Sequence, residues 1–295
     1  MITMPEFATA TDLVSALKRY DQEVTQDWVM TPRYRLKYLI WGPSDGFPLI
    51  LIHGLCDTPR SFAMLMARLV DRGIRCISYY LADGRGDRAR LGAYKHADFT
   101  ADLIALLDHL RIDQADLLGS SFGSTISLRS LSDHPARFRR GILQGGFARR
   151  PLLAIERGLA RLGRYWPWRM GELPIREWVM TKLEAAQFVG CPPEIFRFLL
   201  DNSGLTPIRA AARRALLLDQ LDLRSRLPRI PHPVLLIGGD RDTIVPRMYE
   251  AEVEAGLPRV HRIEFSPCGH YPQYTLPVPM ADAVARFCRG ESTPF

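Results

Sequence analysis

The sequence lacks the features that mark secreted, metal-binding or membrane-spanning chains. Its five cysteines are odd in number and show no C-x-x-C spacing, which argues against a disulfide framework and against a metal site. No apolar run is long enough to cross a bilayer. Residues 1–10 contain Pro5 and Glu6 and have no basic start before an apolar core, so no signal peptide is predicted. We therefore expect a cytoplasmic protein without a bound metal.

Lysine is also scarce. Only four of the 39 basic residues are lysines, and arginines occur throughout the chain. The formal net charge of +7 would suit a nucleic-acid partner, but proteins of that kind gather their basic residues in one patch or stripe. A solvated surface explains dispersed arginines, and no nucleic-acid partner is expected.

Strand and helix patterns alternate in most of the chain. With 295 residues and 47 % hydrophobic content, the chain can bury a large core. Apolar runs of strand length alternate with helical periods from residue 49 to residue 147 and again after residue 231, as a mostly parallel sheet flanked by helices requires. Two earlier strand patterns, residues 24–30 and 34–41, predict an antiparallel hairpin that opens the sheet.

The alternation stops in residues 148–230, where four helical patterns follow one another without a strand pattern. A structureless loop of this size inside a compact domain is improbable. We therefore predict a core domain made of residues 1–147 and 231–295, with residues 148–230 inserted as a helical cap (lid) over the carboxyl edge of the sheet. Substrate preference is expected to reside in this cap.

The predicted cap is rich in aromatic and basic residues. Its large aromatic residues are Trp166, Trp168, Trp178, Phe188, Phe196 and Phe198. Most of them are expected to pack the cap onto the core, and the alternative is an apolar pocket lining. Six arginines surround the first two tryptophans, at positions 149, 150, 157, 161, 164 and 169. A solvated helix face is the simpler interpretation, and contact with a membrane surface or an acidic ligand is the alternative.

The pentapeptide GSSFG at residues 119–123 joins a strand pattern to a helical pattern. A strand, a sharp turn and a helix in this order form a nucleophile elbow. Gly119 and Gly123 supply the small side chains that such a tight turn needs. The turn would expose the hydroxyl of Ser121, which has a glycine two positions away on each side, at the carboxyl edge of the sheet.

A base and an acid for this serine follow later in the chain. A serine hydroxyl attacks well only when a base removes its proton, and that base needs a carboxylate to orient it. Asp242 lies in a turn after the strand pattern at residues 233–237, and His270 follows the strand pattern at residues 260–265. Asp240 is the alternative acid, although its place in the turn also suits a solvated residue.

These residues resemble the motifs of the α/β-hydrolase superfamily, and the similarity extends over nearly the whole chain. GSSFG matches the elbow, Asp242 matches the acid of the G-x-x-D-x-x-x-P pattern, and His270 matches the base of G-H-x-P. The resemblance implies an α/β-hydrolase fold in which Ser121, Asp242 and His270 form a catalytic triad. It also implies that the reaction needs no cofactor.

The resemblance further implies an oxyanion hole. The dipeptide His53-Gly54 after a strand pattern is similar to the family's HG motif, so that the backbone N–H groups of Leu55 and Phe122 would stabilise the oxyanion. The sequence DGRG at residues 83–86 resembles the family's D-x-R-G loop. Cys56 and Asp57 follow the HG motif, where either turn structure or a place in the pocket wall would explain them.

The activity implied by the resemblance is that of a serine hydrolase that forms an acyl-enzyme. The expected substrate is a carboxylic ester with an apolar acyl or aryl group. Hydrolysis of a carbon-carbon bond, a thioester, a lactone or an amide is the alternative on the same triad. A non-catalytic ligand receptor on this fold is an alternative of another class, and a lipase at a membrane surface is a third. The sequence leaves open whether the protein forms a homo-oligomer.

Overall fold

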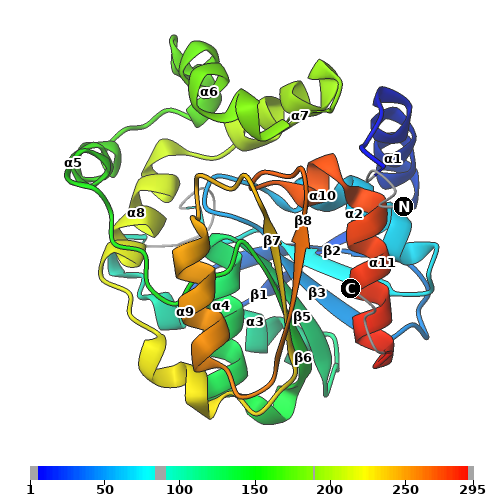
Figure 1. The fold of residues 1–295 in the computed structure, drawn as a ribbon. Helices are drawn as coiled ribbons and strands as arrows, with labels where there is room; N and C mark the ends of the chain where they lie inside the picture. Colours follow the sequence, from blue (N-terminus) through cyan, green and yellow to red (C-terminus); the bar gives the residue numbers. More distant parts are fainter. Residues whose placement is uncertain (1–5, 84–90, 189, 292–295) are drawn as a thin grey trace.

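The computed structural model describes residues 6–83, 91–188 and 190–291 (Figure 1). Within these residues the chain forms one eight-stranded sheet with the order β1-β2-β4-β3-β5-β6-β7-β8. The strands are β1 (Thr25–Met30), β2 (Arg35–Trp41), β3 (Pro48–Ile52), β4 (Arg75–Tyr79), β5 (Ala115–Ser120), β6 (Phe138–Gln144), β7 (Val234–Gly239) and β8 (Val260–Phe265). β2 pairs antiparallel with both β1 and β4, and all other neighbours are parallel. The predicted hairpin and parallel sheet are confirmed.

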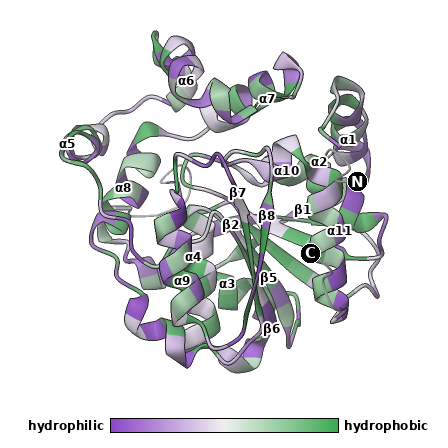
Figure 2. Ribbon diagram, viewed as in Figure 1, coloured by the Kyte–Doolittle hydropathy of each residue, from purple (hydrophilic) through white to green (hydrophobic). Residues whose placement is uncertain are grey.

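Helices cover both faces of this sheet. Successive strand residues point to opposite faces, so Leu49 and Leu51 of β3 join one apolar cluster, with α1, α2 and α11, and Ile50 and Ile52 join the other, with α3, α4 and α9. The helices outside residues 148–230 are α1 (Ala10–Glu23), α2 (Ala63–Val70), α3 (His96–His109), α4 (Phe122–Asp133), α9 (Arg247–Gly256), α10 (Pro272–Thr275) and α11 (Pro277–Arg289). They carry both hydrophobic and hydrophilic residues, as expected of helices between a sheet and solvent (Figure 2). Among the described helices, none is both long and apolar enough to cross a membrane.

Residues 148–230, which we call the helical insertion, lie for the most part at the edge where the parallel strands end, and residues 224–230 lead back along the sheet to the start of β7 (Figure 1). They form α5 (Ala154–Gly163), α6 (Arg176–Glu184), the short 3-10 helix η5 (Ala185–Phe188), α7 (Pro193–Gly204) and α8 (Ile208–Asp219). The four helices that the sequence predicts here are therefore present. The division of the chain into a core domain and a cap domain stays a prediction.

The aromatic residues of the insertion fall into two groups. Phe188 and Phe198 are buried and Phe196 is partly buried against the same cluster, as expected of side chains that pack the insertion onto the core. Trp166, Trp168 and Trp178 are exposed, so the expectation that most of these aromatic residues are packed is wrong for the tryptophans.

Hydrogen bonds fasten the insertion to the loop after β3. The side-chain amide of Asn202 in α7 donates to the Asp57 carboxylate, which also accepts from the Tyr274 hydroxyl at 3.1 Å. Thr206 donates its hydroxyl to the carbonyl of Cys56 at 2.7 Å. Burial raises the pKa of Asp57 to about 7, although its hydrogen bonds act in the opposite direction. Cys56 and Asp57 therefore hold the insertion in place, in agreement with a structural role.

A buried arginine makes a second connection. Arg214 of α8 is buried, and its guanidinium donates to the carbonyl of Leu55 at 2.7 Å and to the carbonyl of Leu81 at 3.0 Å. These carbonyls belong to the loops after β3 and β4, so one side chain of the insertion joins two loops of the sheet.

The sharp turn between β5 and α4 depends on close backbone contacts. A Cβ atom at Gly123 would lie 2.1 Å from the carbonyl oxygen of Ile52 in β3, and one at Gly119 would lie 2.4 Å from the carbonyl oxygen of Gly123. Neither backbone can yield without moving the sheet or the helix. Glycine at these positions therefore lets α4 start directly against the neighbouring strand.

We expect Gly123→Ala to destabilise the fold by about 3 kcal/mol or more, because the added methyl group overlaps backbone atoms. The control is Gly158→Ala in α5, where no atom lies within 4 Å of the added Cβ. Alanine favours helix over glycine, so this variant should gain up to about 1 kcal/mol. Urea unfolding measures both, and a similar free energy of unfolding for the two variants would contradict the packing argument.

Candidate active site

Ser121 lies in the turn between β5 and α4 with an unusual backbone conformation. Its φ is 52° and its ψ is −113°, a combination that costs energy for a residue with a side chain. Its backbone N–H donates to the carbonyl of Gln144 at 2.8 Å. The neighbouring Ser120 is buried and donates its hydroxyl to the Gln144 side chain, whereas Ser121 is partly exposed. Ser121 is thus the serine available to a substrate.

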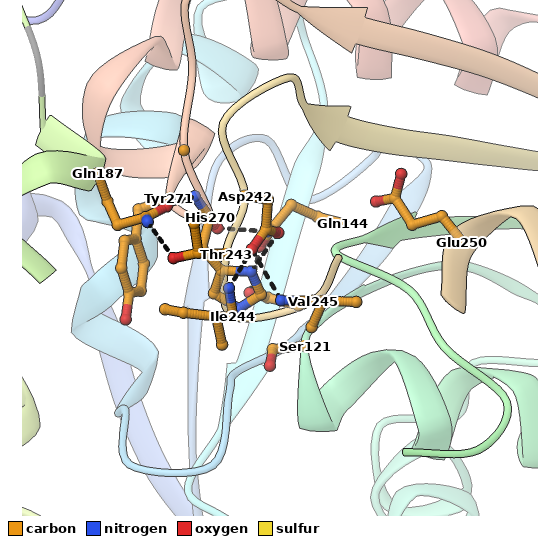
Figure 3. Close-up of polar contacts among 12 residues, drawn as sticks. Ser121, Gln144, Gln187, Asp242, Thr243, Ile244, Val245, Glu250, His270 and Tyr271 are labelled. Carbon is orange, nitrogen blue, oxygen red and sulfur yellow. Dashed lines mark hydrogen bonds and ion pairs between the residues drawn. The ribbon is translucent and has the colours of Figure 1, made fainter. Parts of the chain in front are cut away.

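His270 and Asp242 form a short contact. His270 Nδ1 lies 2.6 Å from Asp242 Oδ2, and both side chains are only 4 % exposed (Figure 3). The other carboxylate oxygen accepts the backbone N–H groups of Ile244 and Val245 at 2.9 and 2.8 Å. An ionised carboxylate only accepts hydrogen bonds, so Nδ1 carries the proton and donates it to Asp242. Nε2 then carries no proton and can act as a base.

His270 and Ser121 contact two consecutive residues of the chain, Gly145 and Gln144. A Cβ atom at Gly145, whose φ is 56°, would lie 2.6 Å from His270 Cε1, so the imidazole rests against this glycine. The preceding residue, Gln144, binds the N–H of Ser121. Within the described residues no hydrogen bond joins Ser121 Oγ to His270, which is common before a substrate is bound. The structure therefore brings all three predicted triad residues to one place.

Asp240, the alternative acid, faces elsewhere. Its carboxylate accepts the Ser266 hydroxyl at 2.7 Å and the N–H of Cys268 at 2.8 Å. It thereby braces the loop that carries His270, and the acid that contacts the imidazole is Asp242.

The surroundings of His270 favour its protonated form. Burial by itself would lower the pKa of His270, but the charge and the hydrogen bond of Asp242 outweigh burial and bring the pKa above its ordinary value of 6.5. Glu184 and Glu250 act in the same direction from a greater distance. An imidazolium formed during a reaction would therefore be stabilised.

Two backbone N–H groups lie near Ser121. Phe122 is the first residue of α4, where a backbone N–H has no partner inside the helix. A Cβ atom at Gly54, directly before Leu55, would lie 3.7 Å from Ser121 Cβ, so the loop after β3 runs past the serine. The predicted oxyanion residues Leu55 and Phe122 therefore flank Ser121 in the chain's fold.

His53 orders the loop that carries Leu55. Its ring is buried, its Nε2 accepts the N–H of Leu81 at 3.3 Å, and its Nδ1 lies 2.9 Å from the carbonyl of Gly54. Because Nε2 accepts, Nδ1 carries the proton and donates. Burial lowers the pKa of His53 to about 3, so the ring is neutral and has a structural role.

Two glutamines that the sequence did not single out connect the site. Gln144 Nε2 donates to the carbonyl of His270 at 2.6 Å. Gln187 of η5 accepts the N–H of His270 at 2.9 Å and donates to the Thr243 hydroxyl at 2.7 Å (Figure 3). No sequence motif marks either residue, because their partners lie far away in the chain.

Two acidic residues near the site were also missed. Glu250 of α9 is buried beside β7 and lies 3.6 Å from Arg262, and burial raises its pKa to about 7. Glu184 of α6 accepts the hydroxyl of Tyr271, and burial raises its pKa as well. Both carboxyl groups add negative charge near His270 when they are ionised.

Two further predictions concern the D-x-R-G loop and metal binding. Of the predicted DGRG sequence, residues 84–86 lie outside the described residues. Among the residues that are described, no three His, Cys, Asp or Glu side chains are grouped as metal ligands would be.

Comparison with known proteins finds relatives that are named as hydrolytic enzymes. The chain is 25 % identical to 2-hydroxymuconate semialdehyde hydrolase of Pseudomonas sp. over 82 % of this chain and 87 % of the relative. It is 28 % identical to 3-oxoadipate enol-lactonase 2 of Acinetobacter baylyi over 71 % and 76 % of the two chains. A thermophilic esterase from Thermogutta terrifontis has a similar fold, with a TM-score of 0.76 and 20 % identity over 90 % of this chain and 98 % of that one.

The strongest comparison is with a family rather than with one protein. The model of the alpha/beta hydrolase family matches residues 49–286, which include the elbow, Asp242 and His270. The mostly parallel sheet with helices on both faces agrees with that match. This chain belongs to the alpha/beta hydrolase family.

Proposed function

We propose that the protein is a serine hydrolase that works through an acyl-enzyme and that its preferred substrate is a carboxylic ester. The observation that carries this proposal is the 2.6 Å contact between Asp242 and His270, next to a serine in a nucleophile elbow. A buried carboxylate bound to Nδ1 gives the imidazole the tautomer that a serine nucleophile needs.

In the proposed reaction, Ser121 Oγ attacks the ester carbonyl and its proton passes to His270 Nε2. The N–H groups of Leu55 and Phe122 stabilise the oxyanion, and each is worth about a hundredfold in rate or more. The carbon-oxygen bond to the leaving group breaks, and the departing alcohol takes the proton from His270. Water then attacks the acyl group and gives a proton to His270, the carbon-oxygen bond to Ser121 breaks, and His270 returns the proton to Ser121 Oγ as the acid leaves.

Of the reactions considered, hydrolysis of an ester makes the smallest demand on the catalytic residues that are present. Its leaving group is an oxygen that needs one proton, which His270 supplies. A carbon leaving group is much more basic and depends on electron-withdrawing groups of the substrate itself. The described site therefore suffices for an ester without a further acid.

The aromatic side chains next to His270 support the proposal that the substrate has an apolar acyl or aryl substituent. The ring of Tyr271 meets the His270 ring edge to face at a centroid distance of 5.1 Å, and Phe188 of η5 stacks on Tyr271 at 5.3 Å. Phe196 contacts Phe188 at 5.2 Å. These rings form an apolar cluster in which Phe188 is buried, and the Tyr271 ring at its edge, beside His270, would suit a hydrophobic substituent.

Two relatives support a second candidate. One is named for hydrolysis of a semialdehyde and another for an enol-lactone, and both align over more than two thirds of this chain. Cleavage of a carbon-carbon bond or a lactone by the same triad is therefore the alternative to ester cleavage. Thioesters and amides use the same chemistry. A non-catalytic receptor is disfavoured because serine, acid and base are all present and assembled.

A fluorophosphonate probe tests the nucleophile without knowledge of the substrate. We expect an adduct on Ser121 in peptide mass spectrometry, with loss of the adduct in Ser121→Ala and in His270→Ala. Ser120→Ala is the control for the neighbouring serine and should still carry the adduct on Ser121. No adduct on a folded protein would favour the receptor.

The bond preference is tested with matched acyl groups. We compare kcat/KM for p-nitrophenyl esters, the corresponding lactone and a vinylogous diketone. The ester proposal predicts the highest value for the esters, and a loss of about 10⁴-fold or more in Ser121→Ala. A higher value for the lactone or the diketone would replace the ester by the second candidate.

The acid assignment is tested by two isosteric variants. Asp242→Asn should lower kcat/KM about 10⁴-fold, because an amide next to Nδ1 favours the wrong tautomer of His270. Asp240→Asn should change kcat/KM by less than about tenfold, since Asp240 contacts only the loop around His270. Equal losses in the two variants would contradict the assignment.

The pH dependence of kcat/KM reports the base. His270 acts only when neutral, so activity falls as the pH drops through its raised pKa, and the midpoint of this acid limb should lie above 6.5. Glu250→Gln removes a nearby negative charge and should move the midpoint to lower pH. Glu252→Gln, on the same helix, partly exposed and paired with Arg224, is the control. Identical profiles for both variants would show that Glu250 does not act on His270.

A further inference from the structure

Exposed apolar side chains are concentrated in one short segment of the helical insertion. Residues 153–178 carry nine of the fifteen large apolar side chains that are exposed within the described part of the chain. They are Leu153, Ile155, Leu159, Leu162, Tyr165, Trp166, Trp168, Ile175 and Trp178. Scattered exposed apolar residues are normal on a protein surface, whereas contiguous exposed apolar residues mark a binding surface.

In α5 the large side chains lie on the outer face. Ile155, Leu159 and Leu162, which we call the outer stripe, follow helical spacing and are 71 %, 66 % and 71 % exposed. The inner face uses small residues, since Ala160 packs against Ala212 of α8. The helix lies at the periphery of the fold (Figure 1) and carries both hydrophobic and hydrophilic residues (Figure 2).

The orientation of α5 is fixed by its contacts. Arg157 Nε donates to Asp219 of α8 at 2.6 Å, and Asp219 also accepts the N–H of Leu152 at 2.9 Å. A Cβ atom at Gly163 would lie 3.2 Å from Ala212 Cβ, so α5 and α8 are close together. The outer stripe therefore cannot turn toward the core while these contacts hold.

The same segment is basic. Residues 153–178 carry five basic and three acidic side chains, a net charge of +2, and the stretch 157–171 within them has four arginines and no acidic residue. Arg161, Arg164 and Arg169 are exposed beside the apolar residues.

We propose that residues 153–178 dock the protein onto an anionic membrane surface. A helix with an apolar stripe, flanked by arginines and followed by tryptophans, has the composition of a segment that lies in the plane of a lipid interface. Trp166 and Trp168, which meet edge to face at 5.7 Å, are of the type that prefers the headgroup region. The positive charge complements anionic lipid headgroups.

A second copy of the chain is the alternative partner for such a surface. In a twofold dimer the same patch faces itself, so two copies of the arginine-rich stretch 157–171 would be brought together. An anionic surface neutralises this charge, whereas a second copy adds to it. The charge therefore favours the membrane.

Sedimentation with lipid vesicles tests the proposal on the full chain. The probe is phosphatidylcholine with about one third phosphatidylglycerol, compared with phosphatidylcholine alone. The protein should sediment with the anionic vesicles, with a shift of tryptophan emission to shorter wavelength. Binding should weaken strongly when salt is raised from about 0.1 M to about 1 M. Absence of binding, or equal binding to neutral vesicles, would overturn the proposal.

Two pairs of variants locate the surface. The double variant Arg161→Glu and Arg164→Glu should weaken binding about tenfold or more, and Arg259→Glu, an exposed arginine on the loop before β8, should not. The double variant Leu159→Ser and Leu162→Ser should also weaken it, and Met248→Ser, a residue 70 % exposed on α9, should not. Binding of the α5 variants at the level of the unchanged protein would contradict the proposal.

Size-exclusion chromatography addresses the second copy. A dimer that dissociates in the Leu159→Ser and Leu162→Ser variant would assign the surface to self-association and overturn the proposal. Vesicle binding does not depend on the proposed ester hydrolysis, so the two hypotheses fail separately. Urea unfolding shows that each variant is folded.

Discussion

The hydrogen bonds of one buried side chain and its backbone hold together the turn that carries Ser121 and the loop that carries His270. Gln144, at the end of β6, binds the N–H of Ser121 through its carbonyl, the hydroxyl of Ser120 through its side-chain oxygen, and the carbonyl of His270 through its side-chain nitrogen. These groups come from two segments separated by more than a hundred residues. A glutamine can satisfy both segments because its amide is a donor and an acceptor at once.

The candidate triad residues could be singled out from the sequence because they depend on local backbone demands. Ser121 needs glycines at fixed distances, and Asp242 and His270 each follow a strand pattern in an order typical of the family. Gln144 and Glu250 were not predictable, since their importance arises only when β6 and α9 lie beside loops from elsewhere in the chain. The exposed tryptophans and the outer stripe of α5 have the spacing of a buried face, and spacing alone does not show what lies opposite.

The attachment of the helical insertion explains how so exposed a segment can belong to an ordered protein. Arg214 and Asn202 reach into the loops after β3 and β4, so α7 and α8 are held by buried polar contacts. α5 is held in turn by small residues and by Asp219. Because polar and close-packed contacts provide this attachment, the large apolar side chains of α5 are not needed for it.

Gln187 gives the insertion a direct connection to the loops of both the base and the acid. It accepts the N–H of His270 and donates to Thr243, the residue after Asp242. A movement that lifted η5 away to admit a substrate would also remove these two bonds from the loops that align the imidazole. In such an opened state the loop of His270 would be less firmly held, so opening of η5 and alignment of the imidazole would exclude each other.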